Sequence, residues 1–159
     1  MERSADHPPL WKVIAGATLL VGTLDISDAF IFYGLRGTSP IKILQGIASG
    51  VLGRAAFGMG ARSALLGLFF HYFIAFSATT VFLLAARKLP LAQHPWLYGT
   101  LFGVALYIVM NYIVLPLSKI GLRPTPPLIP LINGVAVLVF CIGIPLAFIA
   151  RRFVPQQIP

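Results

Sequence analysis

The feature that most constrains this chain is a long apolar segment, residues 13–35, with two aspartates near its middle. The segment is long enough to cross the hydrocarbon core of a bilayer, which takes about 20 residues. A carboxylate at that depth costs about 2.5–3.5 kcal/mol on insertion scales, so it needs a partner, a proton or access to water. Asp25 and Asp28 therefore predict a polar site inside a membrane protein.

The composition indicates that lipid is the main solvent of the chain. Of its 159 residues, 58% are hydrophobic and 10% are charged, and the mean hydropathy is +0.89. Soluble domains carry about 25% charged residues, so this chain could not cover a water-facing surface. The net charge is +8, but no basic run exceeds two residues. Because no basic stripe with interleaved aromatic residues is present, we expect the lipid bilayer and not nucleic acid as the partner.

Four segments reach the length of a membrane span, and we expect them to form one membrane domain over residues 1–159. They are residues 13–35, 63–86, 96–118 and 128–150. Residues 40–53 are too short to span, but their apolar side chains recur at helical spacing after a serine and a proline that suit a helix start. The predicted fold is an all-α transmembrane bundle of four helices, with an additional short interfacial or re-entrant helix between the first two. Short tails are expected at 1–10 and 154–159.

The orientation of the spans follows from the basic residues beside them. Lysine and arginine are divided almost evenly between the two sides, whereas cytoplasmic loops normally carry an excess of them. The pairs Arg87-Lys88 and Arg151-Arg152 adjoin their spans directly, on the side that also holds both termini. Residues close to span ends weigh most in this rule, so we predict that both termini are cytoplasmic.

Polar side chains from all four spans are predicted to lie at similar depth. At the rise of a helix, they fall roughly 8–15 Å from the side of the first and third loops. These residues are Asp25, Asp28, His71, Asn111 and Asn133. They share helix faces with small residues, which suit contact between helices, so they should point into the bundle. We predict that they form a buried site for a proton or cation, with Gln45 and Ser49 of the short helix at its lid or cleft.

Two functions from different classes fit such a site. A small transport protein, linked to protons or cations, would use the aspartates and the histidine, because histidine titrates near neutral pH and ionisable groups in membranes mark pathways. The alternative is a non-catalytic accessory or structural subunit of a larger membrane complex, or a homo-oligomer, in which the same groups only join helices. A transporter needs a water path to the site, whereas a packing subunit does not.

No cofactor is predicted outright, although two ligand sets can be named. Asp25, Asp28 and His71 are of the types that bind divalent metals, but no HxxxH, CxxC or HExxH pattern supports a metal. His71 and Met110 fall at similar depth and could be axial haem ligands, a match that lone residues also reach by chance. Cys141 has no histidine near its depth, so we expect no thiol chemistry and name no catalytic residue.

Four stretches of the chain resemble small uncharacterised bacterial four-helix inner-membrane proteins. They are GTLDISD (22–28), QGIASG (45–50), GLFFH (67–71) and MNYIVLPLS (110–118). The part from His71 to Pro116 is also distantly similar to the YagU-like group, through His71, Pro90, Gly99, Gly103 and Pro116-Leu117. Neither resemblance implies an established activity. What it implies is a multi-pass location in the bacterial plasma membrane.

Overall fold

The protein is a bundle of long helices. The structure is a computed structural model, which describes residues 8–122 and 124–154. Within them lie four helical segments that are long and apolar enough to cross a membrane. They are α1 (Leu10–Gly34), α3 (Ala61–Lys88), Pro95–Leu117 and Leu128–Phe153. The four predicted spans are confirmed as apolar helices, with ends shifted by a few residues, and Leu10 belongs to the first helix and not to the tail.

The third and fourth spans each contain a π-helical turn. The third consists of α4 (Pro95–Val109), η3 (Met110–Val114) and α5 (Leu115–Leu117). The fourth consists of α6 (Leu128–Val137), η4 (Leu138–Gly143) and α7 (Ile144–Phe153). Pro116 and Pro145 follow the two π-helical turns after one intervening residue. Because proline lacks an N–H and its ring crowds the preceding turn, the chain widens there instead of continuing as a regular α-helix.

The predicted short helix is present as α2 (Pro40–Leu52). Ser39 caps it, since its hydroxyl accepts a hydrogen bond from the Lys42 N–H at 3.4 Å, and Pro40 occupies the first turn. A 3₁₀ helix, η1 (Gly53–Gly58), then leads to α3. Gly53, the first residue of η1, and Gly60, two residues after its end, have φ of 65° and 60°, a conformation that residues with a Cβ adopt rarely.

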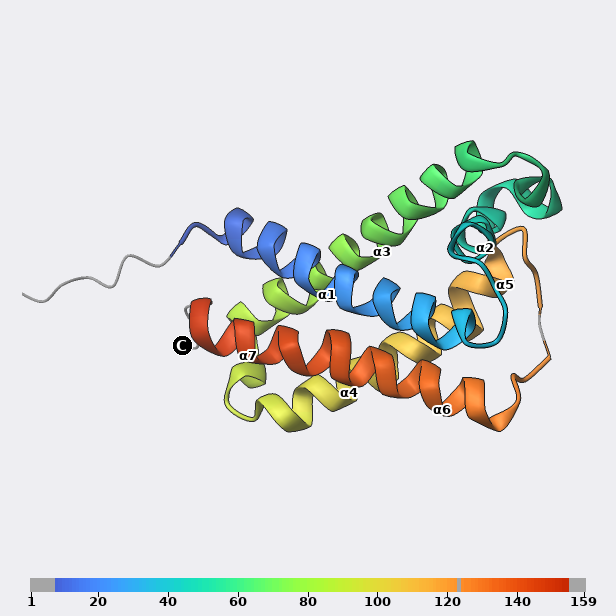
Figure 1. Ribbon diagram of the computed structural model, residues 1–159. Helices are drawn as coiled ribbons and strands as arrows, with labels where there is room; N and C mark the ends of the chain where they lie inside the picture. Colours follow the sequence, from blue (N-terminus) through green and yellow to red (C-terminus); the bar gives the residue numbers. More distant parts are fainter. Residues whose placement is uncertain (1–7, 123, 155–159) are drawn as a thin grey trace, which may run out of the picture.

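The two ends of the bundle differ in their make-up. Figure 1 shows the start of α1, the end of α7 and the turn between α3 and α4 at one end, called the terminus end below. That turn contains η2 (Pro90–Ala92). The opposite end, called the α2 end, holds α2, η1 and the loop after α5 (Figure 1). Figure 1 shows α2 nearly end-on while the long helices run across the view, so α2 lies across the ends of its neighbours.

The tightest packing lies at the terminus end. The core there is formed by apolar side chains of α1, α3, η4 and α7, with Val154: Val13, Ala17, Val21, Phe82, Leu83, Ala86, Ile142, Leu146, Ala147, Ala150 and Val154. Gly99 and Gly103 let α4 approach the backbone of the fourth span, since a Cβ on Gly103 would lie 2.5 Å from the Val139 Cα. Toward the α2 end, α1 and α3 diverge (Figure 1).

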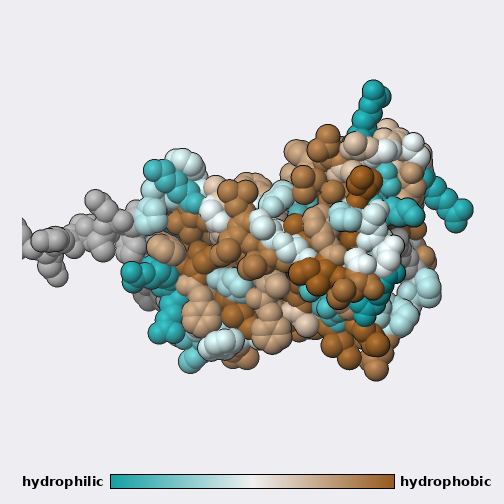
Figure 2. All heavy atoms as spheres, viewed as in Figure 1, coloured by the Kyte–Doolittle hydropathy of each residue, from teal (hydrophilic) through white to brown (hydrophobic). Residues whose placement is uncertain are grey.

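The outer surface of the bundle is largely apolar. Figure 2 shows brown and white residues over its middle, with teal residues concentrated toward the two ends of the face in view. Exposed large side chains include Leu65, Phe69, Ile132 and Phe140. A water-soluble monomer rarely exposes so much contiguous apolar surface, whereas a lipid-facing one requires it.

Candidate functional site

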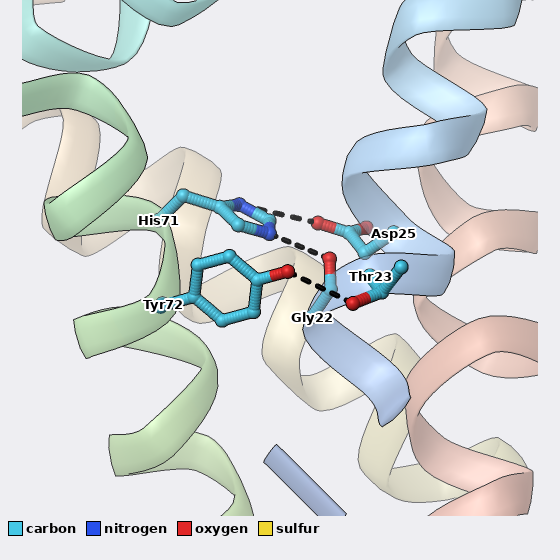
Figure 3. A network of polar contacts seen from close by, with 5 residues as sticks. All are labelled: Gly22, Thr23, Asp25, His71 and Tyr72. Atoms are coloured by element: carbon cyan, nitrogen blue, oxygen red, sulfur yellow. Dashed lines mark hydrogen bonds and ion pairs between the residues drawn. The ribbon is translucent and has the colours of Figure 1, made fainter. Parts of the chain in front are cut away.

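Asp25 and His71 meet where α1 crosses α3. Figure 3 shows the His71 imidazole reaching from α3 to α1, with one ring nitrogen toward the backbone and the other toward Asp25. The His71 Nε2 lies 2.8 Å from the carbonyl oxygen of Gly22. The His71 Nδ1 lies 3.8 Å from Oδ2 of Asp25. Two of the predicted site residues, from two different spans, are thus brought together.

The carbonyl of Gly22 determines the tautomer of His71. A carbonyl oxygen only accepts hydrogen bonds, so Nε2 must carry a hydrogen and donate it. The Nδ1 atom, which faces Asp25, is therefore the nitrogen without a hydrogen in the neutral ring. At 3.8 Å the two groups are too far apart for a direct hydrogen bond, so a hydrogen-bonded link between them needs a closer approach or a bridging water molecule.

The close approach of the two helices depends on Gly22. A Cβ at this position would lie 2.8 Å from Cε1 of Tyr72 and 3.3 Å from Cβ of Ala75. Beside the pair, the Thr23 and Tyr72 hydroxyls are 2.8 Å apart and form a second hydrogen bond between the same helices (Figure 3). Thr23 and Tyr72 were not predicted as site residues. Their positions next to Gly22 and His71 were the signal available.

Asp28 has a different partner. Its Oδ2 accepts a hydrogen bond of 2.8 Å from Nδ2 of Asn133, which joins α1 to α6. Both residues are half-buried. The two aspartates are three residues apart, yet one turns toward α3 and the other toward the fourth span, so the structure places them in two separate pairs.

Asn111 is not part of either pair. Its Nδ2 donates to the carbonyl of Tyr107, one turn earlier in its own span, at 3.0 Å. It lines a separate cavity of about 500 Å³, together with Tyr33, Tyr107 and Tyr112. The predicted five-residue constellation therefore separates into Asp25 with His71, Asp28 with Asn133, and Asn111 alone; its role in binding a proton or cation stays a prediction.

The two lid residues of α2 are buried against neighbouring backbone. Gln45 donates through Nε2 to the carbonyl of Gly60 at 3.0 Å, and Ser49 donates to the carbonyl of Gly46 at 2.6 Å. Neither side chain lines the cavity beside Asp25, which α2 borders instead with Gly46 and Gly50, among others. Gln45 thus ties α2 to the segment before α3, whereas the Ser49 hydrogen bond stays within α2, and a direct role of either residue in a lid stays a prediction.

A large cavity opens beside the Asp25–His71 pair. Its volume is about 680 Å³, within the range of small-molecule sites, and Asp25 and His71 both line it. Its walls come from α1, α2, α3 and the third and fourth spans, including residues of both π-helical turns. Most of the lining is apolar, as with Ile26, Phe70 and Ile142. The ionisable pair is therefore placed at an apolar cavity that the sequence analysis did not describe.

Polar residues at the α2 end of this cavity were also not predicted as site residues. They are Thr38, Lys42 and Ser118. Lys42 lies in the predicted interfacial helix. Ser118, by contrast, begins the loop after α5 and reaches Gly50 of α2 only in the folded structure. That loop is tied to α2, because the Lys119 N–H donates to the Gly50 carbonyl at 2.8 Å.

The predicted metal and haem ligands lie as follows. Across residues 8–122 and 124–154, no three His, Cys, Asp or Glu side chains are grouped closely enough to hold a metal ion. Asp28 is paired with Asn133, apart from Asp25 and His71. His71 and Met110 both line the large cavity. The metal and haem hypotheses both stay untested.

Comparison of the chain with protein-family models, with curated proteins and with solved structures finds no match. The resemblance to YagU-like proteins stays a prediction.

Proposed function

We propose that this chain is a multi-pass membrane protein for proton-linked transport, and that Asp25 and His71 take up and release the proton. The observation that carries the proposal is that both side chains line one large cavity, while His71 is anchored by Gly22. The His71 side chain is 9% exposed, whereas the Asp25 side chain is 23% exposed. Ionisable groups placed in this way inside a membrane domain usually belong to a pathway and not to packing alone.

The proton exchange itself takes place between these two side chains, after closer approach or through a bridging water molecule. A proton delivered by water in the cavity binds the Asp25 carboxylate and then moves to Nδ1 of His71, giving an imidazolium that still donates Nε2–H to Gly22. Its attraction to the carboxylate then holds the pair together. Loss of the Nδ1 proton to the other side restores the starting state, so one proton crosses in each cycle.

Hydroxyl groups continue from the pair toward the terminus end. Thr18 of α1 and Thr79 of α3 are both buried, and each lies about two turns from the pair along its helix. Within the described part of the chain, neither hydroxyl has a hydrogen-bond partner. Buried hydroxyls are normally paired, so these two are positions where transient water could complete a proton path.

The placement in a bilayer is supported by the ends of the bundle. Trp11 and Trp96 are exposed at the terminus end, where tryptophan commonly anchors a span at the interface. Basic residues flank the spans there and at the α2 end. With α2 lying across the other end, an interfacial position of this helix fits the arrangement. The proposal includes cytoplasmic termini in a bacterial plasma membrane.

An accessory subunit is the second candidate, because the other helices of the bundle bury little of the third span. In the apolar stretch of this span 6% of residues are buried, against 28% or 33% in the other three spans. A partner protein or a second copy could cover this face in place of lipid. This candidate predicts no proton flux from the protein alone.

The test is proton flux in liposomes that contain the purified protein and an internal pH-sensitive dye. In liposomes that contain the unchanged protein, we expect a membrane potential set by potassium and valinomycin to drive protons across the bilayer. Asp25→Asn, which keeps its size but cannot titrate, and His71→Gln, which keeps a donor for Gly22, should both abolish the flux. Asp28→Asn is the matched control and should retain it. Absence of flux from the folded, unchanged protein would favour the accessory subunit.

A further inference from the structure

We propose that the large cavity binds one single-chain amphiphile, with its hydrocarbon chain against the apolar walls and an anionic headgroup at Lys42. This inference rests on the proposed function, because it assigns the substrate class to the cavity that contains the proposed proton site. The apolar walls favour a hydrocarbon body, and the basic α2 end favours an anionic headgroup.

The walls of the cavity favour hydrocarbon. Between its two polar ends the lining consists largely of apolar side chains such as Ile43, Ile47, Phe70, Ile74, Leu138 and Ile142. Water gains few hydrogen bonds in such a space, whereas a hydrocarbon chain contacts the apolar walls without losing any. A volume of about 680 Å³ suits a ligand of moderate size. A single flexible chain is the simplest occupant that matches a cavity extending from Asp25 to α2.

The charges at the α2 end favour an anion. Lys42 and Thr38 line the cavity there, and no carboxylate in the described residues forms an ion pair with Lys42. Further basic residues lie on the same end: Arg36, Arg54, Arg62 and Lys119. The acids among the described residues are Asp25 and Asp28, both inside α1. The summed field at this end therefore attracts an anionic headgroup and repels a cationic one.

The opposite end of the cavity explains how the amphiphile would be linked to the proton. A hydrocarbon chain next to Asp25 and His71 removes water, which disfavours an isolated negative charge more than a neutral ion pair. Uptake of one proton by the pair gives either a neutral pair of groups or a carboxylate beside an imidazolium, both without net charge. Binding of the chain and uptake of a proton should therefore favour each other.

Gly46 provides a way to block the cavity without disturbing the fold. It lies in α2, lines the cavity, and has no atom within 4 Å of the place where its Cβ would be. Gly46→Leu therefore fills cavity space and also replaces a glycine within a helix by a better helix former. Gly16 in α1 is also free of neighbours and lies outside both cavities, so Gly16→Leu is the matched control.

The experiment is equilibrium binding of radiolabelled dodecyl phosphate to the purified protein in nanodiscs of zwitterionic lipid, with empty nanodiscs subtracted. We expect saturable binding of one molecule per chain. Gly46→Leu should weaken it by about tenfold or more, which corresponds to about 1.4 kcal/mol. Gly16→Leu should leave binding unchanged. The Lys42 side chain is exposed, so Lys42→Gln should leave the fold unchanged. It should weaken binding by about threefold, as expected for the loss of one partly screened charge.

Dodecyltrimethylammonium, which has the same chain and a cationic headgroup, is the second probe. Binding of this cation as tight as that of dodecyl phosphate would overturn the assignment of an anion. Unchanged binding in Gly46→Leu would overturn the assignment to this cavity. The assay requires no flux, so binding without proton flux refutes only the proposed function, and flux without binding refutes only the present inference.

Discussion

The Nε2 atom of His71 lies 2.8 Å from the carbonyl oxygen of Gly22, and this contact determines which nitrogen of the ring faces Asp25. A backbone carbonyl cannot donate, so Nε2 retains its hydrogen whatever the state of the other nitrogen. Helix α1 therefore supplies both the anchor of the imidazole and, three residues later, the carboxylate toward which Nδ1 turns. In the proposed proton cycle, the proton shared by the pair therefore lies between Nδ1 and Asp25.

Removing both members of this pair should cost less stability than the two single removals added together. Asp25→Leu or His71→Phe leaves one polar group without its partner, whereas the double change removes both groups. We expect each single change to lower the free energy of unfolding by about 0.6 kcal/mol or more, and the double change to lower it by less than the sum. Thermal unfolding of the purified variants measures this.

A triple variant that adds Asp28→Leu should be less stable than the double variant, because Asn133 then loses its acceptor. If the folded triple variant still carried protons like the unchanged protein, the pair would not be the proton site, and the role in packing would be the better account.

Gly67→Ala should detach α2 from α3. A Cβ on Gly67 would overlap the backbone carbonyl of Leu44, which cannot move aside without the helix. We expect the free energy of unfolding to fall by about 1–3 kcal/mol, as for other overpacked contacts. Gly46→Ala is the control, since open space surrounds its Cβ and alanine favours the helix, so its melting temperature should be equal or higher. Equal melting temperatures for the two variants would contradict this packing of α2.

Thr18→Val and Thr79→Val separate a proton path from simple packing. Valine has nearly the shape of threonine and removes a buried hydroxyl that has no partner in the described structure, so stability should be unchanged or slightly higher. Proton flux in liposomes should nevertheless fall if the hydroxyls complete the path. Unchanged flux in the double variant would show that protons leave the pair by another route. The exposed Ser77→Ala serves as a control on α3.

Reporter fusions test the topology. A reporter fused after Pro159 should be active in the cytoplasm, and reporters inserted at Gly37 or Gly121 should be active in the periplasm. Both glycines lie in turns at the α2 end, with φ of 83° and 72°, and no side chain occupies the space beside them. The reverse pattern would place the large cavity on the cytoplasmic side, and termini on opposite sides would be incompatible with four spans.

The four spans and the short helix could be predicted from the sequence because they depend on local properties. A run of about 20 apolar residues must satisfy its own backbone hydrogen bonds in lipid, so it forms a helix wherever it occurs. The serine and proline before α2 likewise determine its start within a few residues. The presence of a polar site followed from the cost of Asp25 at depth, which is also a property of one segment.

The partners of each polar residue depended on the tertiary structure. Depth along a helix does not specify rotation about its axis or the angle at which two helices cross, and both are decided by close contacts such as that of Gly22 with Tyr72 and Ala75. Those contacts direct Asp25 to α3 and leave Asp28 to the fourth span. They also make α1 and α3 diverge, which opens the cavity, a volume between segments that no single segment encodes.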